Sequence, residues 1–248
     1  LKKIVDGIAM SSSANTPFQV HLQNLNGSSP AFILRHIFTE PKTATYNHVI
    51  VLNDAEEAAY FYNSIESITG AMDLFYFPSS FKTSQNFSWL NPSHVMLRTE
   101  ALTKLSMGGN KKIVVTYPEA FFEKVIMPKT LQDNIIQIKT NDTLGLDALM
   151  ERLVEYGFER TDFVYEPGQF ALRGGIFDIY SFGNEKPYRV ELFGEEVDSI
   201  RLFDPETQLS ERKLLQVNII PNVTTQFEDT IKIPFMEFVP EHTVVWLK

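Results

Sequence analysis

The chain has 248 residues, of which 44% are hydrophobic and 12% aromatic, so it can bury the core of one large domain or two smaller ones and is not expected to be disordered. Its 22 Lys and Arg against 31 Asp and Glu give a net charge of −9, which disfavours a surface built to neutralise nucleic-acid phosphates. Without cysteine it forms no disulfide or thiolate metal site, and without a long apolar run we expect a soluble, cytoplasmic protein.

The first half of the chain alternates strand-like and helix-like patterns, which is typical of a parallel sheet covered by helices. Short runs of β-branched and aromatic residues predict strands at 48–52, 74–77 and 113–116. Helices are expected at 55–69, 93–107 and 118–125. Asn53 and Asp54 would cap the first helix and Gly70 would end it, and a polar loop is expected at 79–91. These patterns indicate an α/β domain.

The pattern changes near Pro128 and predicts a second, α+β unit. A strand is expected at 135–138, followed by a helix that is capped by Asp142 or Thr143 and ends at Gly157. Three runs of antiparallel type then follow, at residues 168–181, 187–193 and 196–203.

The end of the chain predicts how these two units are connected. Residues 222–240 are polar and contain prolines, so we expect a linker there, followed by a strand at 243–247 that rejoins the first sheet. We therefore predict a discontinuous α/β domain formed by residues 1–126 and 222–248, with the α+β domain inserted at 127–221. Because the chain begins at Leu1 and stops on a strand-like segment, we expect a fragment of a longer protein.

The turn at residues 24–32 invites comparison with a phosphate-binding loop. Such a loop needs glycines whose neighbouring N–H groups converge on phosphate, a Lys for the terminal phosphates, and a hydroxyl for Mg²⁺. Gly27 and Ser28 fit this pattern, but Pro30 stands where the Lys would be and Ala31 where the hydroxyl would be. The segment therefore predicts a degenerate, non-functional phosphate loop, or simply a Ser/Gly turn that caps a helix.

The sequence offers no other candidate for catalysis or metal binding. The five histidines have no metal-ligand spacing, and no Gly-x-Ser-x-Gly nucleophile turn occurs. Acidic pairs such as Glu56–Glu57 are adjacent in sequence and are typical of solvated faces. We expect neither a catalytic residue nor a metal ligand.

A binding surface is indicated by the strand at 187–193. Tyr188, Val190 and Leu192 alternate with Arg189, Glu191 and Phe193, so a core on the first face leaves the second face outside. Arg and aromatic residues dominate interface hot spots, which makes Phe193 beside Arg189 a candidate anchor. The alternative is that Phe193 packs under a loop.

A neighbouring strand adds a second arginine to this surface. In the run at 170–178, Arg173 alternates with Phe170 and Leu172 and is expected to share the polar side with Arg189. Gly174 and Gly175 follow this strand. They either serve the fold, by permitting a bulge or a close approach of another backbone, or they serve the binding of a partner.

These segments resemble a known module. Residues 167–180 (PGQFALRGGIFDIY), 187–194 (PYRVELFG) and 196–201 (EVDSIR), followed by Phe203 and Asp204, are similar to the domain shared by UvrB and the bacterial transcription-repair coupling factors (Mfd). UvrB carries an intact phosphate loop and a long aromatic hairpin, whereas this chain has Pro30 and Ala31 and only a short segment between Phe77 and Ser93. The resemblance therefore favours the N-terminal region of the coupling factors.

The resemblance implies a degenerate RecA/helicase-like domain with an inserted α+β domain like domain 2 of UvrB. The inserted domain would dock UvrA through Arg173, Arg189 and Phe193, with Glu191 as a companion. The resemblance implies neither a cofactor nor a membrane contact for this region. ATP, Mg²⁺, RNA polymerase and DNA would be bound by other parts of the parent chain. An intramolecular contact that masks the UvrA surface is a further implication.

Two rival functions remain open. The first is a UvrB-type, ATP-dependent damage-recognition subunit, which a working phosphate loop would distinguish. The second is a structural or autoinhibitory domain held against the rest of the parent chain.

Overall fold

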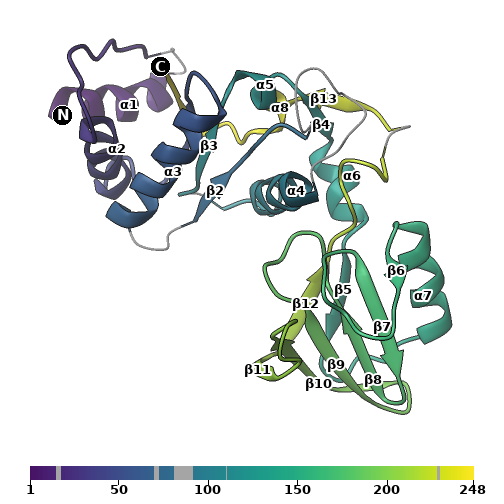
Figure 1. Ribbon diagram of the computed structural model, residues 1–248. Helices are drawn as coiled ribbons and strands as arrows, with labels where there is room; N and C mark the ends of the chain where they lie inside the picture. The colour runs from purple at the N-terminus through teal and green to yellow at the C-terminus, as the bar shows by residue number, and fades with distance from the viewer. Residues whose placement is uncertain (15–17, 70–72, 81–91, 110, 228–229) are drawn as a thin grey trace. The chain divides into compact units, whose positions relative to one another are not determined.

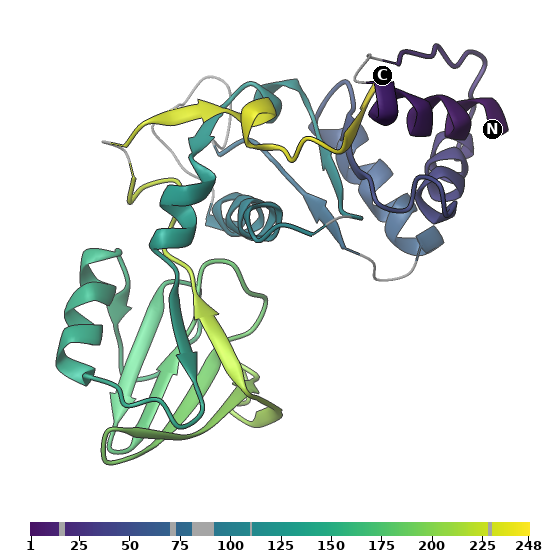
Figure 2. The same ribbon diagram turned by 180° about the vertical axis from the view of Figure 1, so that it is seen from behind.

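The computed structural model describes residues 1–14, 18–69, 73–80, 92–109, 111–227 and 230–248, and the chain divides into two compact units (Figures 1 and 2). The first unit comprises Leu1–Ser79, Met107–Lys124 and Ile233–Lys248, and the second comprises Ser80–Ser106 and Val125–Lys232. This division assigns residues 80–106 and 222–232 to the second unit, whereas the prediction placed both segments in the first. Within the described residues, none of the helices combines the length and the apolar character that crossing a bilayer would require.

The first unit contains a parallel sheet of four strands. In spatial order these are β14 (Thr243–Leu247), β1 (Asn47–Val51), β3 (Ile113–Thr116) and β2 (Leu74–Tyr76). Every residue of β1 and β3 is buried, as their β-branched composition predicts for central strands. Strand β14 pairs with β1 from Asn47 opposite Thr243 to Val51 opposite Leu247, which confirms that the last strand rejoins the first sheet.

Helices of the first unit bury apolar stripes against this sheet and against one another. Helix α1 (Lys2–Ala14) packs Ile4, Val5 and Ile8 against Ile37 of α2 (Ser29–Thr39) and against Val244 and Trp246 of β14. Helix α3 (Ala55–Thr69) contacts β2 and β3. Its N-terminus is capped as predicted, since the Asp54 carboxylate accepts a hydrogen bond of 2.8 Å from the Glu57 amide.

Two predictions for the first unit were wrong in part. The helix expected at 118–125 ends early, because α5 covers only Pro118–Phe121 and β4 (Lys124–Ile126) buries the β-branched Val125 and Ile126. The linker expected at 222–240 contains β13 (Lys232–Pro234) and α8 (Phe235–Phe238). Phe235 is fully buried and stacks on Phe77 with ring centroids 4.3 Å apart, so this segment belongs to the core. Gly70 and residues 81–91 of the predicted loop lie outside the described residues.

The second unit contains a sheet of six strands. In spatial order these are β11 (Ser210–Leu214), β10 (Glu196–Phe203), β9 (Tyr188–Phe193), β8 (Ile176–Ile179), β7 (Gln169–Arg173) and β6 (Glu159–Arg160). All neighbours are antiparallel except β6 and β7. A separate antiparallel pair joins β5 (Ile136–Lys139) to β12 (Gln216–Ile219). The chain is thus a mixed α/β protein with one parallel sheet and a separate, mostly antiparallel one.

One face of the six-stranded sheet forms the core of the second unit. Phe177, Val190 and Ile200 from this face pack with Ile138 of β5 and Leu153 of α7 (Leu146–Glu155). The other helices of this unit are α4 (Pro92–Ser106) and α6 (Pro128–Asp133), which contact each other.

The end signals of α7 were predicted half correctly. The N-cap residue is Gly145. The two predicted caps are engaged elsewhere: the Asp142 carboxylate accepts a hydrogen bond from the Lys139 amide, and Thr143 pairs with Glu196. The predicted caps are therefore wrong. The helix does end before Gly157, which adopts φ +78.

Candidate partner-binding surface

The four residues singled out in the sequence lie on the face of the six-stranded sheet that points away from its core. The register places Arg189 of β9 opposite Asp178 of β8, and Glu191 opposite Ile176. Arg173 lies on β7, the next strand, opposite Ile176. The apolar alternates of these strands are in the core on the other face, as side-chain parity predicts.

Arg173 and Arg189 do not stand free but share one buried carboxylate. Asp178 is 0% exposed, and its Oδ1 accepts a hydrogen bond of 2.8 Å from Arg189 Nε. Its Oδ2 accepts bonds of 2.9 Å from Arg189 Nη2 and 2.7 Å from Arg173 Nη2. The pair with Arg189 is bidentate, which is the strong geometry for a guanidinium and a carboxylate.

Each guanidinium also rests on an aromatic ring and a backbone carbonyl. Arg173 lies 4.4 Å from the ring centre of Phe163 and donates from Nη1 to the Asp162 carbonyl. Arg189 lies 4.5 Å from the ring centre of Phe203 and donates from Nη1 to the Gln208 carbonyl at 3.0 Å. The hydrogen bond to Asp178 raises the pKa of Arg189, because it stabilises the charged guanidinium.

Glu191 lies on the same face, and its hydrogen bonds go to Ser199 and Arg201 of β10. Its Oε2 accepts hydrogen bonds from Ser199 Oγ at 2.5 Å and from Arg201 Nη2 at 3.2 Å. Its position agrees with the strand parity, and its carboxylate is partly neutralised within the domain.

Phe193 is the most exposed large hydrophobic residue of this face, at 84%. It closes strand β9 and pairs with Glu196 across a hairpin whose Gly194 adopts φ +64. It lies four positions along the strand from Arg189, a distance of roughly 13 Å. The alternative that Phe193 packs under a loop is therefore wrong, because its ring is open to solvent.

Two residues of this surface were missed or left open by sequence reasoning. Asp178 was not singled out, although it alternates with the buried Phe177 and Ile179 and so had to share a face with the arginines. Gly175 has a fold role: a Cβ on it would lie 2.8 Å from the Leu192 carbonyl oxygen, and its own carbonyl accepts the Leu192 N–H at 2.7 Å.

The turn at residues 24–32, predicted from the sequence to be a degenerate phosphate loop or a simple Ser/Gly turn, leads into helix α2 in the first unit. Ala31 is 1% exposed, so the position where a hydroxyl would bind Mg²⁺ is occupied by a core methyl group. Ser28 occupies the N-cap position without a side-chain hydrogen bond, and the turn is closed instead by Ser29, whose Oγ donates to the Asn26 carbonyl at 2.7 Å. The interpretation as a Ser/Gly turn that caps a helix is therefore confirmed, although the cap makes no side-chain hydrogen bond.

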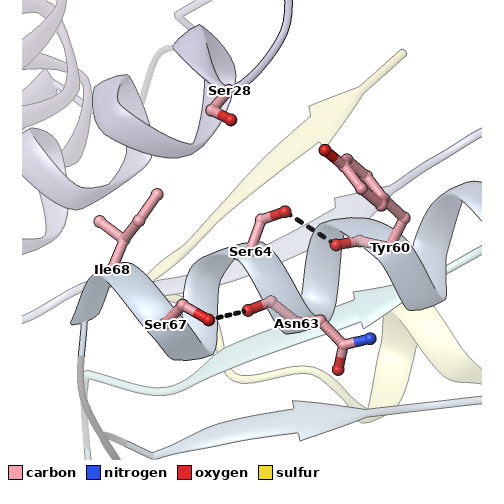
Figure 3. Close-up of a pocket in the computed structure, with 6 residues that line it drawn as sticks. All are labelled: Ser28, Tyr60, Asn63, Ser64, Ser67 and Ile68. Atoms are coloured by element: carbon pink, nitrogen blue, oxygen red, sulfur yellow. Dashed lines mark hydrogen bonds between the residues drawn. The ribbon is translucent and has the colours of Figure 1, made fainter.

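A shallow hollow of about 330 Å³ lies between this turn and one face of α3 (Figure 3). Ser64 and Ser67 donate to carbonyl oxygens of their own helix at 2.9 Å, so their hydroxyl protons are not directed into the hollow. Among the described residues, its lining holds no Lys or Arg to bind a phosphate. The residues that line it are Ser28, Tyr60, Asn63, Ser64, Ser67 and Ile68. Nor do the described ranges bring together three or more His, Asp or Glu side chains in a geometry suited to a metal ion.

Comparison with known proteins places the candidate surface in a recognised domain. Residues 136–224 match the family model described as the UvrB interaction domain, and this span includes all four candidate residues. The chain is 31% identical over 213 residues to the transcription-repair-coupling factor of Bacillus subtilis, a match that covers 86% of this chain and 16% of that protein. It is 34% identical over 172 residues to the same factor of Staphylococcus epidermidis, covering 69% of this chain and 14% of that protein. The match to the factor of Staphylococcus aureus is 29% over 211 residues, covering 80% of this chain and 18% of that protein. The chain thus spans less than a fifth of the length of these curated relatives.

Proposed function

Because this chain is homologous to the N-terminal part of the transcription-repair-coupling factors and contains a UvrB interaction domain, we propose that it is an adaptor that recruits UvrA. In the whole protein, recruitment would link a stalled RNA polymerase to nucleotide excision repair. RNA polymerase and DNA would be bound by other parts of the parent chain. The homology itself points to transcription-coupled repair, and the adaptor role is the proposal.

The observation that carries this proposal is the exposed Phe193 beside an arginine cluster within the matched domain. Arg and aromatic side chains are enriched among the residues that dominate interface energies, and a single anchor often contributes 2 kcal/mol or more. Phe193 is 84% exposed in a chain whose other large aromatic residues on this sheet are mostly buried. An aromatic ring held open on a hairpin gains most when it enters an apolar pocket of a partner.

We further propose that the first unit is a degenerate helicase-like domain that neither binds nor hydrolyses nucleotide. Pro30 in place of the phosphate-loop Lys, the buried methyl group of Ala31, and the uncharged lining of the hollow at Ser28 support this. ATP and Mg²⁺ would then be bound elsewhere in the parent chain. The second unit would correspond to domain 2 of UvrB.

The adaptor role is tested by replacing Phe193 with Ala and titrating the chain with UvrA. We expect an affinity loss of about 30-fold, which corresponds to about 2 kcal/mol of lost contact energy. Phe122 is the matched control because it is 78% exposed but lies in the first unit, outside the matched domain. Unchanged affinity of a folded Phe193→Ala variant would contradict the proposal.

The nucleotide proposal is tested by calorimetric titration of the chain with ATP and Mg²⁺. We expect no saturable heat, because the described residues that line the hollow at Ser28 include no Lys or Arg that could neutralise the phosphates. Micromolar binding would instead favour a UvrB-type, ATP-dependent damage-recognition subunit.

A further inference from the structure

The buried carboxylate of Asp178 connects two side chains of the candidate surface that lie on different strands. Arg173 on β7 and Arg189 on β9 are separated by β8, and Asp178 bonds to both of them from that middle strand. Its direct neighbour on β7 is Ala171, whose small side chain lets Arg173 reach across diagonally. Three guanidinium hydrogen bonds occupy both carboxylate oxygens.

Both guanidiniums are therefore fixed before any partner arrives. Each is held at its edge by Asp178, at a second point by a backbone carbonyl, and on its face by an aromatic ring. A free arginine on a surface loses much of its rotamer freedom when it binds, and that entropy opposes association. For Arg173 and Arg189 this rotamer entropy is already lost when the domain folds.

The two arginines are not equivalent toward solvent. The Arg189 side chain is 13% exposed and uses its Nε, Nη1 and Nη2 groups for bonds inside the domain. The Arg173 side chain is 32% exposed, and its bonds to the described residues use only Nη1 and Nη2. Since a guanidinium has five N–H groups, Arg173 retains donors for a partner.

The charge of the cluster points to the chemistry of that partner. With the neighbouring ion pair of Glu191 and Arg201 included, three guanidiniums stand against two carboxylates. One positive charge therefore stays uncompensated, and Arg173 is exposed enough for a partner to reach it. A carboxylate is the group that best matches the remaining guanidinium edge.

We propose that Asp178 is a positioning residue of this surface, which holds Arg173 ready to receive an acidic side chain of the partner, and that Arg189 acts through Asp178. This inference rests on the proposed function, since the partner is UvrA. On a surface of three independent contacts, each substitution would weaken binding separately. A positioning role for Asp178 instead predicts that the losses of affinity on substituting Asp178 and Arg173 are coupled.

The test combines UvrA titrations with a measurement on the free chain. We expect Arg173→Ala to weaken binding about tenfold, as for the loss of a charge-assisted contact, and Asp178→Asn to weaken it severalfold. The double variant should bind no worse than Arg173→Ala alone, because Asp178 acts through that side chain. Losses that multiply in the double variant would overturn the inference.

Nitrogen-15 relaxation at Arg173 Nε of the free chain separates positioning from general stability. We expect this group to be rigid in the parent chain and in Phe193→Ala, and mobile in Asp178→Asn. Because removing a buried carboxylate can unfold the domain, Arg189→Lys is the second variant: it keeps the charge but not the bidentate pair. It should also mobilise Arg173 and weaken binding severalfold.

The outcomes distinguish this inference from the function on which it rests. If Phe193→Ala and Arg173→Ala lose affinity while Asp178→Asn and Arg189→Lys bind as the parent does, with Arg173 still rigid, the positioning role is overturned and the adaptor role stands. If none of the four loses affinity, both are overturned.

Discussion

His48 provides a quantitative prediction about the stability of the parallel sheet. It lies on β1 and is fully buried, and its Nδ1 accepts a hydrogen bond of 3.0 Å from Trp246 Nε1 of β14. The ring is therefore neutral with its proton on Nε2, an atom that is buried without a hydrogen-bond partner among the described residues. Burial lowers the pKa of His48 from 6.5 to about 4.

This lowered pKa makes the folded state sensitive to acid. The unfolded chain binds a proton at His48 near pH 6.5, whereas the folded chain resists it until about pH 4. The stabilisation is therefore complete above pH 6.5 and is lost as the pH falls through this window. At about 1.4 kcal/mol for each pKa unit, the shift corresponds to a loss on the order of 3 kcal/mol.

The assay is urea denaturation of the chain and of His48→Gln between pH 7 and pH 4. The parent should lose about 3 kcal/mol more than His48→Gln over this range, since every other titrating group is common to both. His242→Gln is the matched control, because His242 is exposed. Equal losses in the parent and in His48→Gln would refute the reasoning.

Two further predictions concern residues whose roles only the structure shows. Replacing the fully buried Phe235 with Ala should lower the free energy of unfolding, measured by urea denaturation, by about 3–5 kcal/mol, because the substitution leaves a cavity beside Phe77. A change below about 1 kcal/mol would show that α8 is not part of the core. Gly175→Ala should lower the melting temperature more than Gly174→Ala, because a Cβ at position 175 would lie 2.8 Å from the Leu192 carbonyl oxygen. A Cβ at position 174 meets no atom, so Gly174→Ala costs only the backbone strain of φ +59, about 1 kcal/mol. The reverse order of melting temperatures would contradict the close approach at Gly175.

The elements that could be predicted are those whose signal is local. The buried runs at β1 and β3 are continuous and β-branched, and a buried central strand needs that pattern whatever surrounds it. The alternation along β9 fixes which side chains share a face, because successive residues of a strand point to opposite sides. Local signals failed where burial depends on distant partners. Val125 was expected to end a helix but belongs, with Ile126, to strand β4. Phe235 was expected in a linker but lies in the core, where its ring stacks on Phe77.

The candidate surface divides along the same line. The sequence by itself determined that Arg173, Arg189, Glu191 and Phe193 lie on the outer face, because strand parity needs no knowledge of neighbours. Only the tertiary structure decided which of them are open to a partner. The register of β7, β8 and β9 brings Asp178 between the two arginines, and the structure leaves Arg189 largely covered and Phe193 exposed. Register is a property of three strands together, and no single strand encodes it.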